Sequence, residues 1–176
     1  MRKNILALAL ACAAGAASAG NLDIYAGTRL GMQHSDAAVT GALSAERQGA
    51  TSELFVGRQV SPSLAVEVSA SDFAKLGLVD STGRNTSNWG RSLAVEGVYK
   101  HNLQGPWALT ARGGLAYTKG SFARDKQDRL APVLGLGVQY RLSPTTFLDL
   151  QWRHIHGMGV ASNQVDTVTA GVGFRF

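Results

Sequence analysis

The sequence has 176 residues, with 17 Lys and Arg against 12 Asp and Glu, and a single cysteine. That length is typical of one domain, and one cysteine excludes an intramolecular disulfide framework. The net charge of +5 is mild and carries no dense Lys/Arg run, so the clustered basic stripe of a nucleic-acid-binding protein is missing and no nucleic-acid partner is expected.

The first predicted element is a secretory signal peptide over residues 1–19. Arg2 and Lys3 precede an apolar stretch, and Ala17-Ser18-Ala19 fits the small-x-small pattern of a signal-peptidase site. The apolar stretch is too short to cross a membrane as a helix. Cleavage would leave a mature domain of residues 20–176.

Two alternatives to the signal peptide stay open. One is a buried N-terminal helix, and the other is a lipoprotein acylated at Cys12, although Ala9 stands where a leucine is normally found. Loss of Arg2 and Lys3 with the signal would lower the mature net charge to +3. This excess of positive charge favours attraction to an anionic surface such as lipopolysaccharide.

Alternating residues dominate the rest of the chain. No stretch after residue 20 approaches 18 consecutive apolar residues, which excludes helical membrane spans. Segments of about ten residues alternate between apolar and polar instead, and a period of two indicates strands with unlike faces. The predicted strands lie at roughly 21–31, 51–60, 63–74, 88–101, 106–119, 130–142, 145–156 and 164–176.

The connections between these strands alternate strictly between long and short. The short ones are 61–62, 102–105 and 143–144, and the long polar ones lie near 32–50, 75–87, 120–129 and 157–163. This alternation is typical of an outer-membrane barrel with short periplasmic turns and longer outer loops, and it places both ends of the mature chain in the periplasm. A soluble β-sandwich or lipocalin-like barrel would also have about eight strands.

Aromatic residues lie at both ends of the apolar faces, and their spacing distinguishes a membrane barrel from the soluble alternatives. Trp89 and Tyr99 lie ten residues apart, as do Trp107 and Tyr117. Ten residues at about 3.3 Å, projected for a tilt near 40°, rise roughly 25 Å, which is the height of a lipid-facing band. We therefore predict a transmembrane barrel with an aromatic girdle formed by Trp89, Tyr99, Trp107, Tyr117, Tyr140 and Trp152.

The opposite faces carry charges and small residues. The predicted lumen charge network consists of Arg29, Glu67, Glu96, Arg112, Arg141, Asp149 and Arg153. Side chains fill an eight-stranded barrel and leave no open channel, and charges removed from water must pair. Lumen packing is the favoured interpretation, and a gated proton or ion path is the alternative.

The residues that most resemble a chemical site lie near the fourth long connection. His154 and His156 would share an outward face, but a metal site needs further ligands, and we predict neither metal nor cofactor. His154, His156, Ser162 and Asp166 also contain the residue types of a Ser/His/acid hydrolase. Interfacial histidines beside a tryptophan are the favoured interpretation, and the protein is predicted not to be an enzyme.

The segments PVLGLGVQYRLSPTTFLDLQWRHI and VDTVTAGVGFRF resemble the closing half of the OmpA-like transmembrane β-barrel family. ELFVGRQVSPSLAVEVSASDFAKLG resembles its second and third strands. The resemblance implies an all-β, eight-stranded antiparallel up-and-down transmembrane β-barrel in the outer membrane of a Gram-negative bacterium. It also implies that the barrel-assembly machinery reads the final strand, with Phe174 and Phe176 as the assembly signal. Larger members of the family add a peptidoglycan-binding domain.

The resulting functional prediction is a non-enzymatic barrel that supports envelope integrity and surface interactions through its extracellular loops. Its expected partners are outer-membrane lipids and lipopolysaccharide, the barrel-assembly machinery and an unknown surface ligand. Near the outer rim or in the third long connection lie Arg91, Lys119, Arg124, Lys126 and Arg129. Two interpretations stay open for them: contacts with lipopolysaccharide phosphates, or ordinary solvated loop charges. A narrow channel and a lipid A-modifying enzyme are the alternatives.

Overall fold

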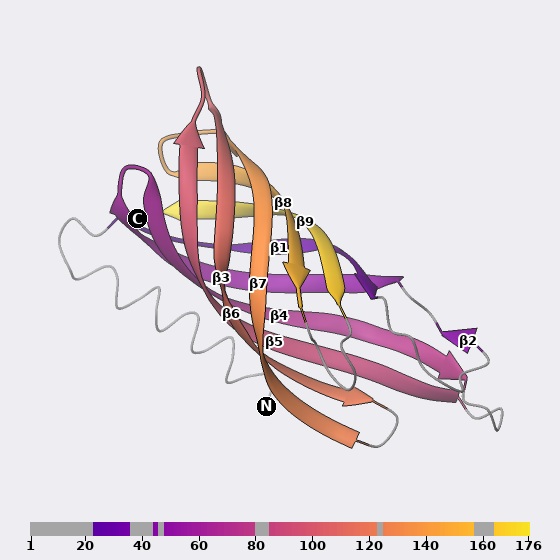
Figure 1. The fold of residues 1–176 in the computed structure, drawn as a ribbon. Coiled ribbons are helices and arrows are strands. Elements are labelled where there is room, and N and C mark those ends of the chain that lie inside the picture. Colours follow the sequence, from indigo (N-terminus) through magenta and orange to yellow (C-terminus); the bar gives the residue numbers. More distant parts are fainter. Residues whose placement is uncertain (1–22, 36–43, 46–47, 80–84, 123–124, 157–163) are drawn as a thin grey trace.

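Eight long strands close into an antiparallel barrel (Figure 1). The computed structural model describes residues 23–35, 44–45, 48–79, 85–122, 125–156 and 164–176. The strands are β1 (Ile24–Ser35), β3 (Gln48–Ser61), β4 (Leu64–Val79), β5 (Asn85–Asn102), β6 (Trp107–Phe122), β7 (Asp125–Arg141), β8 (Thr146–Ile155) and β9 (Val165–Arg175). The two-residue strand β2 (Ser44–Ala45) adds to the far end of β4. The predicted eight-stranded up-and-down barrel is confirmed, and the predicted signal peptide lies outside the described residues.

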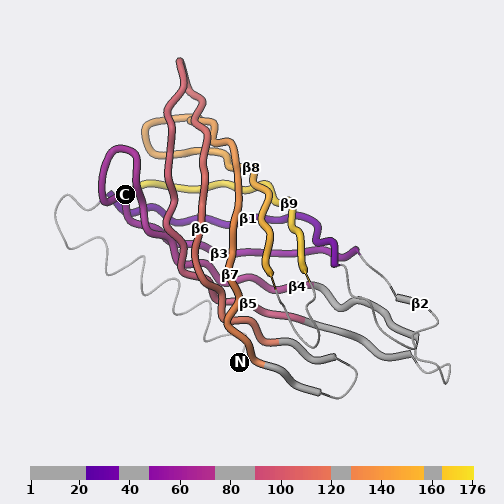
Figure 2. Tube along the Cα trace, viewed as in Figure 1, coloured from indigo at the N-terminus to yellow at the C-terminus, as the bar shows by residue number. Residues whose placement is uncertain are grey.

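The barrel closes through β1, which pairs antiparallel with β3 on one side and with β9 on the other. The remaining long strands pair with their neighbours in the sequence. Figure 2 shows the last strand, in yellow, beside the indigo first strand. A closed sheet satisfies its backbone hydrogen bonds internally, which a strand in lipid requires because no water is available there.

Three short connections mark one end of the barrel, called here the short-turn end. They join β3 to β4, β5 to β6, and β7 to β8. In the second turn the amide of Leu103 donates to the Trp107 carbonyl oxygen at 2.9 Å. Gly105 has a φ of 80°, which glycine adopts without the steric cost that a Cβ atom would add.

At the opposite end, called here the long-connection end, β1 and β3 to β7 extend further than predicted, whereas β8 and β9 do not. β1 continues to Ser35, and the predicted loop 120–129 is largely a hairpin whose arms are β6 and β7. The predicted strands end where the alternation of apolar and polar residues ends. In the structure, backbone pairing continues among the polar residues beyond that point. The predicted connection 157–163 lies outside the described residues.

The outward faces are apolar and exposed, which is the reverse of a soluble barrel. On β7, Leu134 and Leu136 are 63% and 59% exposed, whereas Val133, which directly precedes them, is fully buried. Large exposed apolar side chains recur on the other strands, among them Leu30, Leu93, Val95, Leu115, Leu150 and Val168. Such a surface is an aggregation liability in water and matches a lipid-facing band. Among the described residues no helix is long and apolar enough to cross a membrane.

Candidate functional site

The middle of the lumen is filled by paired charges, called here the ionic layer. The buried guanidinium of Arg29 is its centre: Nη1 donates to Glu53 Oε1 at 2.5 Å and to Glu67 Oε1 at 2.9 Å. Its Nη2 donates to Asp149 Oδ2 at 3.0 Å. One side chain from β1 therefore links carboxylates of β3, β4 and β8 across the lumen.

Two further arginines complete the ionic layer. Arg112 Nη1 donates to Glu67 Oε1 at 2.8 Å, so Glu67 accepts from two guanidinium groups. Arg153 pairs with Glu53 and lies 3.3 Å from Glu96 Oε2 through its Nη2. The layer thus contains three guanidinium groups and four carboxylates, so most of the buried charge is compensated, as burial requires.

Glu53 belongs to the ionic layer but is absent from the predicted network. It accepts hydrogen bonds from Arg29, Arg153, Gln151 and Ser71. The sequence signal was weak because Arg58 shares a face with the apolar residues of this strand. Successive side chains of a strand point to opposite faces, and Leu54 and Val56 point outward. This alternation would have placed Glu53 in the lumen.

An aromatic cluster closes the lumen between the ionic layer and the short-turn end. The ring centroids of Tyr25, Phe55 and Phe147 lie 5.9–6.4 Å apart, and the alanine and valine side chains of Ala65 and Val98 pack with them. The Tyr25 hydroxyl donates to Glu67 Oε2 at 3.2 Å, and the Arg29 guanidinium lies 3.6 Å from the Phe55 centroid. The cluster and the ionic layer therefore form one continuous packing unit.

A second apolar cluster lies on the other side of the ionic layer, toward the long-connection end. Its members are Phe73, Ala94, Ala116, Ala131, Val133, Ile155 and Val165. Ile155 is 1% exposed and Val133 is fully buried. The lumen is thus packed in three layers, with charges between two apolar clusters.

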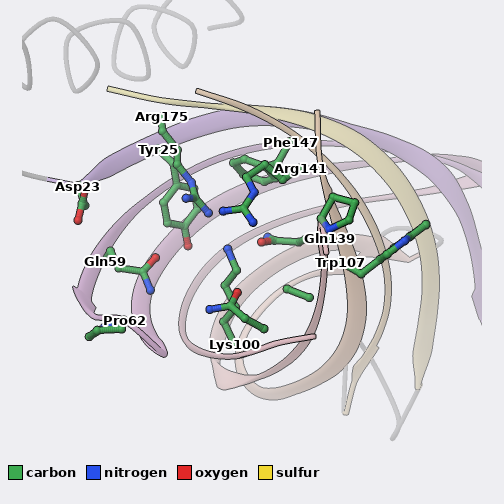
Figure 3. Close-up of a pocket in the computed structure, with 13 residues that line it drawn as sticks. Asp23, Tyr25, Gln59, Pro62, Lys100, Trp107, Gln139, Arg141, Phe147 and Arg175 are labelled. Atoms are coloured by element: carbon green, nitrogen blue, oxygen red, sulfur yellow. The ribbon is translucent and has the colours of Figure 1, made fainter. Parts of the chain in front are cut away.

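A cavity opens at the short-turn end, outside the aromatic cluster, and is called here the mouth cavity (Figure 3). Its volume is about 200 Å³. A smaller cavity beside it, which also contacts Tyr25 and Phe147, has a volume of about 10 Å³. One water molecule needs about 10–15 Å³, so the deeper space holds at most one.

Arg141 lies at this mouth and not in the ionic layer, unlike the prediction. The Arg141 side chain is on the lumen-facing side of β7, as expected. However, β7 ends at this residue, so the side chain meets solvent. Among the described residues, the Arg141 side chain makes one hydrogen bond, a long one of 3.5 Å from Nη2 to the Gly105 carbonyl oxygen. The other six predicted network residues are buried in the ionic layer: Arg29, Glu67, Glu96, Arg112, Asp149 and Arg153.

The aromatic residues predicted to form the girdle lie at both ends of the outward face. Trp107 and Tyr140 pack edge to face near the short-turn end, with ring centroids 4.6 Å apart, and Tyr99 is exposed at the same end. Tyr117 lies toward the long-connection end, where its hydroxyl donates to Asp128 Oδ2 at 2.7 Å. Trp152 is outward-facing near the end of β8. The side chain of Trp89 lies outside the described residues.

Phe174 lies at the C-terminal end of β9 and Phe176 directly beyond it, both on the lipid-facing side. Phe174 is 47% exposed and Phe176 is 65% exposed. The amide of Phe176 donates to the Ile24 carbonyl oxygen at 2.9 Å, so pairing with β1 continues to the last residue described.

At the long-connection rim, the structure brings two of the four candidate hydrolase residues together. His154 Nδ1 lies 3.0 Å from Asp166 Oδ1, on adjacent strands β8 and β9. The His156 ring centroid is 6.2 Å from that of His154, and the His154 ring stacks beside Trp152. Ser162 lies outside the described residues. Across the part of the chain that the structure describes, no three His, Cys, Asp or Glu side chains are grouped to hold a metal.

The basic residues of the outward rim are partly paired. Lys119 Nζ lies 3.6 Å from Asp128 Oδ2, and Arg91 Nε lies 3.6 Å from Asp72 Oδ2. The side chains of Arg124 and Lys126 lie outside the described residues. These exposed pairs contribute little to stability and leave their cations accessible at the surface.

The chain is similar to known barrels in sequence pattern and in fold. The family model described as "Outer membrane protein beta-barrel domain" matches residues 5–176. No curated protein sequence matches significantly.

Three solved structures illustrate the likeness in fold. Neisserial surface protein A has a TM-score of 0.63 at 18% identity, covering 87% of this chain and 97% of its own. The N-terminal β-barrel domain of Pseudomonas aeruginosa OprF has a TM-score of 0.62 at 14% identity, covering 88% and 98%. A de novo designed transmembrane β-barrel has a TM-score of 0.55 at 14% identity, covering 88% and 95%. Since a designed barrel matches as well, these likenesses show the architecture alone.

Proposed function

This chain belongs to the outer membrane protein β-barrel domain family, and from that premise we propose that it is a non-enzymatic, non-conducting barrel of OmpA-like type. It supports envelope integrity and presents its long connections at the cell surface. Outer-membrane lipids and lipopolysaccharide surround its apolar band. The short-turn end faces the periplasm, and residues 1–19 are a cleaved export signal.

The packed lumen is the observation that carries this proposal. A solute crossing the barrel would have to pass two apolar clusters and break the contacts of Arg29, which is bound to three carboxylates. Removing a partner from a buried ion pair costs about 3–5 kcal/mol, so transient opening of the ionic layer is strongly disfavoured. A gated ion path, the alternative, would require all three layers to move together.

Planar-bilayer recordings on the purified, refolded barrel test the absence of conduction. The wild-type protein is expected to give no steps above the protein-free background over a range of voltages and salt concentrations. A Phe55→Ala/Phe147→Ala variant is the matched control, because it opens the aromatic cluster while the ionic layer still blocks the lumen. It is also expected to be silent. Reproducible single-channel steps from the wild type would favour the channel alternative.

A surface role is supported by the accessible cations of the rim and by the length of the connections at that end. One similar structure is named a surface protein, and a comparable role here is part of the proposal. Deleting residues 36–43, between β1 and β2, should leave the barrel assembled but weaken cell-surface binding or envelope resistance. Assembly without any such phenotype, after deletion of each long connection in turn, would remove the surface role.

The His154–Asp166 contact favours a second candidate, acyl-ester hydrolysis at the rim. A carboxylate that orients a histidine is one part of a hydrolytic triad, and Ser162 would have to supply the nucleophile. Mass spectra of lipid A distinguish the two functions. Our proposal predicts identical spectra with the wild type and with His154→Ala, whereas a deacylated species that disappears in the variant would establish the enzyme.

A further inference from the structure

Basic side chains outnumber acidic ones in the wall of the mouth cavity. Lys100 from β5, Arg141 from the end of β7 and Arg175 from the end of β9 line it together with one carboxylate, that of Asp23. Figure 3 shows the three basic groups entering the cavity from different strands, with Asp23 at its edge. The lining therefore carries three positive charges against one negative charge.

The three cations lack the partners that the arginines of the ionic layer possess. Among the described residues, Lys100, Arg141 and Arg175 form no ion pair with a carboxylate. Arg175 has its guanidinium carbon 5.7 Å from the centroid of Phe147, a contact that leaves its N–H donors available. Like charges gathered in one recess repel one another, and an anion placed between them relieves that repulsion.

The shape of the cavity limits what the anion can be. At about 200 Å³ it is smaller than the roughly 300–1,000 Å³ of pockets that hold drug-sized ligands. The aromatic cluster forms its floor, so a ligand enters only from the short-turn side. Guanidinium forks match the oxygen atoms of phosphate in pairs, and an ammonium group adds a point charge.

We propose that the mouth cavity is a binding site for a phosphate group, held by Arg141, Arg175 and Lys100. The group comes either from a free phosphate-bearing solute or from a phospholipid headgroup that folds over the strand ends. That this mouth faces the periplasm rests on the function proposed above, whereas the site itself depends only on the geometry of the cavity.

The test uses the refolded barrel in a maltoside detergent free of phosphate and phospholipid, titrated with inorganic phosphate in a calorimeter. Binding to the wild type should weaken as NaCl is added. Arg141→Gln/Arg175→Gln should weaken it about tenfold or more, because each charged hydrogen bond contributes substantially. Arg141→Lys/Arg175→Lys should retain part of the affinity. Arg58→Gln is the matched control: it removes an exposed cation from the outward face of β3 and should leave binding unchanged.

A second arm identifies the source of the phosphate group. The barrel is reconstituted in vesicles containing phosphatidylglycerol and phosphatidylcholine, and retained lipid is counted by native mass spectrometry. Retention of phosphatidylglycerol that is lost in Arg141→Gln/Arg175→Gln supports a headgroup, and phosphate binding without such retention supports a solute. The site is overturned if neither probe binds, or if Arg58→Gln weakens binding as much as the double variant. A gel-mobility shift between unheated and boiled samples verifies that every variant is folded.

Discussion

Glycines face the three aromatic rings of the lumen across neighbouring strands. Tyr25 lies over Gly57, Phe55 over Gly27 and Phe147 over Gly173, and a Cβ atom at any of these glycines would meet the ring. These pairs are in register across β1–β3 and β8–β9. The glycines thus give the rings room to lie flat on the barrel wall, which also restores the packing that a glycine alone lacks.

Gly173→Ala should therefore destabilise the barrel. The new methyl group overlaps the Phe147 ring, and overpacking of this kind costs about 1–3 kcal/mol. Gly97→Ala is the control, because its Cβ would lie 3.8 Å from the nearest atom and should change the free energy of unfolding little. Urea unfolding followed by tryptophan fluorescence measures both, and equal stabilities would refute the packing described here.

Glu53 pairs with two of the three arginines in the ionic layer. Its replacement by alanine leaves the buried guanidinium groups of Arg29 and Arg153 short of an acceptor, which should cost about 3–5 kcal/mol. Asp72→Ala breaks an exposed pair with Arg91 and should cost about 0–1 kcal/mol. The same unfolding assay checks the difference. Two small and similar losses would show that the layer does not stabilise the fold.

At the scale of the strands, the sequence patterns predicted which face of each strand meets lipid. Residue types alternate with a period of two because one face of each strand meets lipid and the other meets the packed lumen. Leu134 and Leu136 could therefore be assigned to the lipid-facing side without a structure. The ends of the strands could not, because polar residues beyond the band pair in strands as readily as they form loops. Arg141 shows a similar limit: parity gives its face, but its depth depends on where β7 ends.

The alternation of apolar and polar residues also could not predict which lumen side chains contact one another. Nothing local marks Tyr25, Phe55 and Phe147 as one cluster, since they come from strands far apart in the sequence. The same holds for Arg29 and Asp149, which are 120 residues apart and in direct contact. From the sequence alone it follows that the buried charges pair, but not which of them pair with each other.

The lipid-facing assignment of β7 predicts a depth-dependent cost for charge. Leu136 is exposed in the middle of the apolar face, and Leu136→Arg should destabilise the barrel in phospholipid vesicles by about 2–4 kcal/mol. Leu142, equally exposed but beyond Tyr140 at the turn, should tolerate arginine at a cost of about 0–1 kcal/mol. If both substitutions cost the same, the band does not lie between the aromatic residues.

The last strand carries the prediction about assembly. Deleting Phe176 should lower the amount of assembled barrel in cells while changing the stability of refolded protein only slightly, because this side chain is 65% exposed. Leu148→Ala, an outward residue on the neighbouring strand, serves as the control and should assemble normally. Heat-modifiable protein in membrane fractions gives the readout. Normal assembly of the Phe176 deletion would show that Phe176 is not an assembly signal, while the pairing of β9 with β1 would stand.

For the molecule as a whole, the distribution of side chains is inverted relative to a soluble domain. Among the described residues, buried polar and charged side chains outnumber buried apolar ones, and most leucine side chains lie outside. Water would disfavour both arrangements, whereas lipid outside and a compensated ionic layer inside stabilise them. Insertion into a membrane therefore accounts for three features together: the closed barrel, its apolar band and its packed lumen.

The most direct test of that requirement is the mobility of the mature protein in unheated and boiled gel samples, measured across cell fractions. We expect the protein in outer membranes, where it needs detergent for extraction. It should migrate differently before and after boiling because the closed barrel resists unfolding. Recovery of the protein in the periplasmic fraction without detergent, with one mobility in both samples, would contradict this expectation.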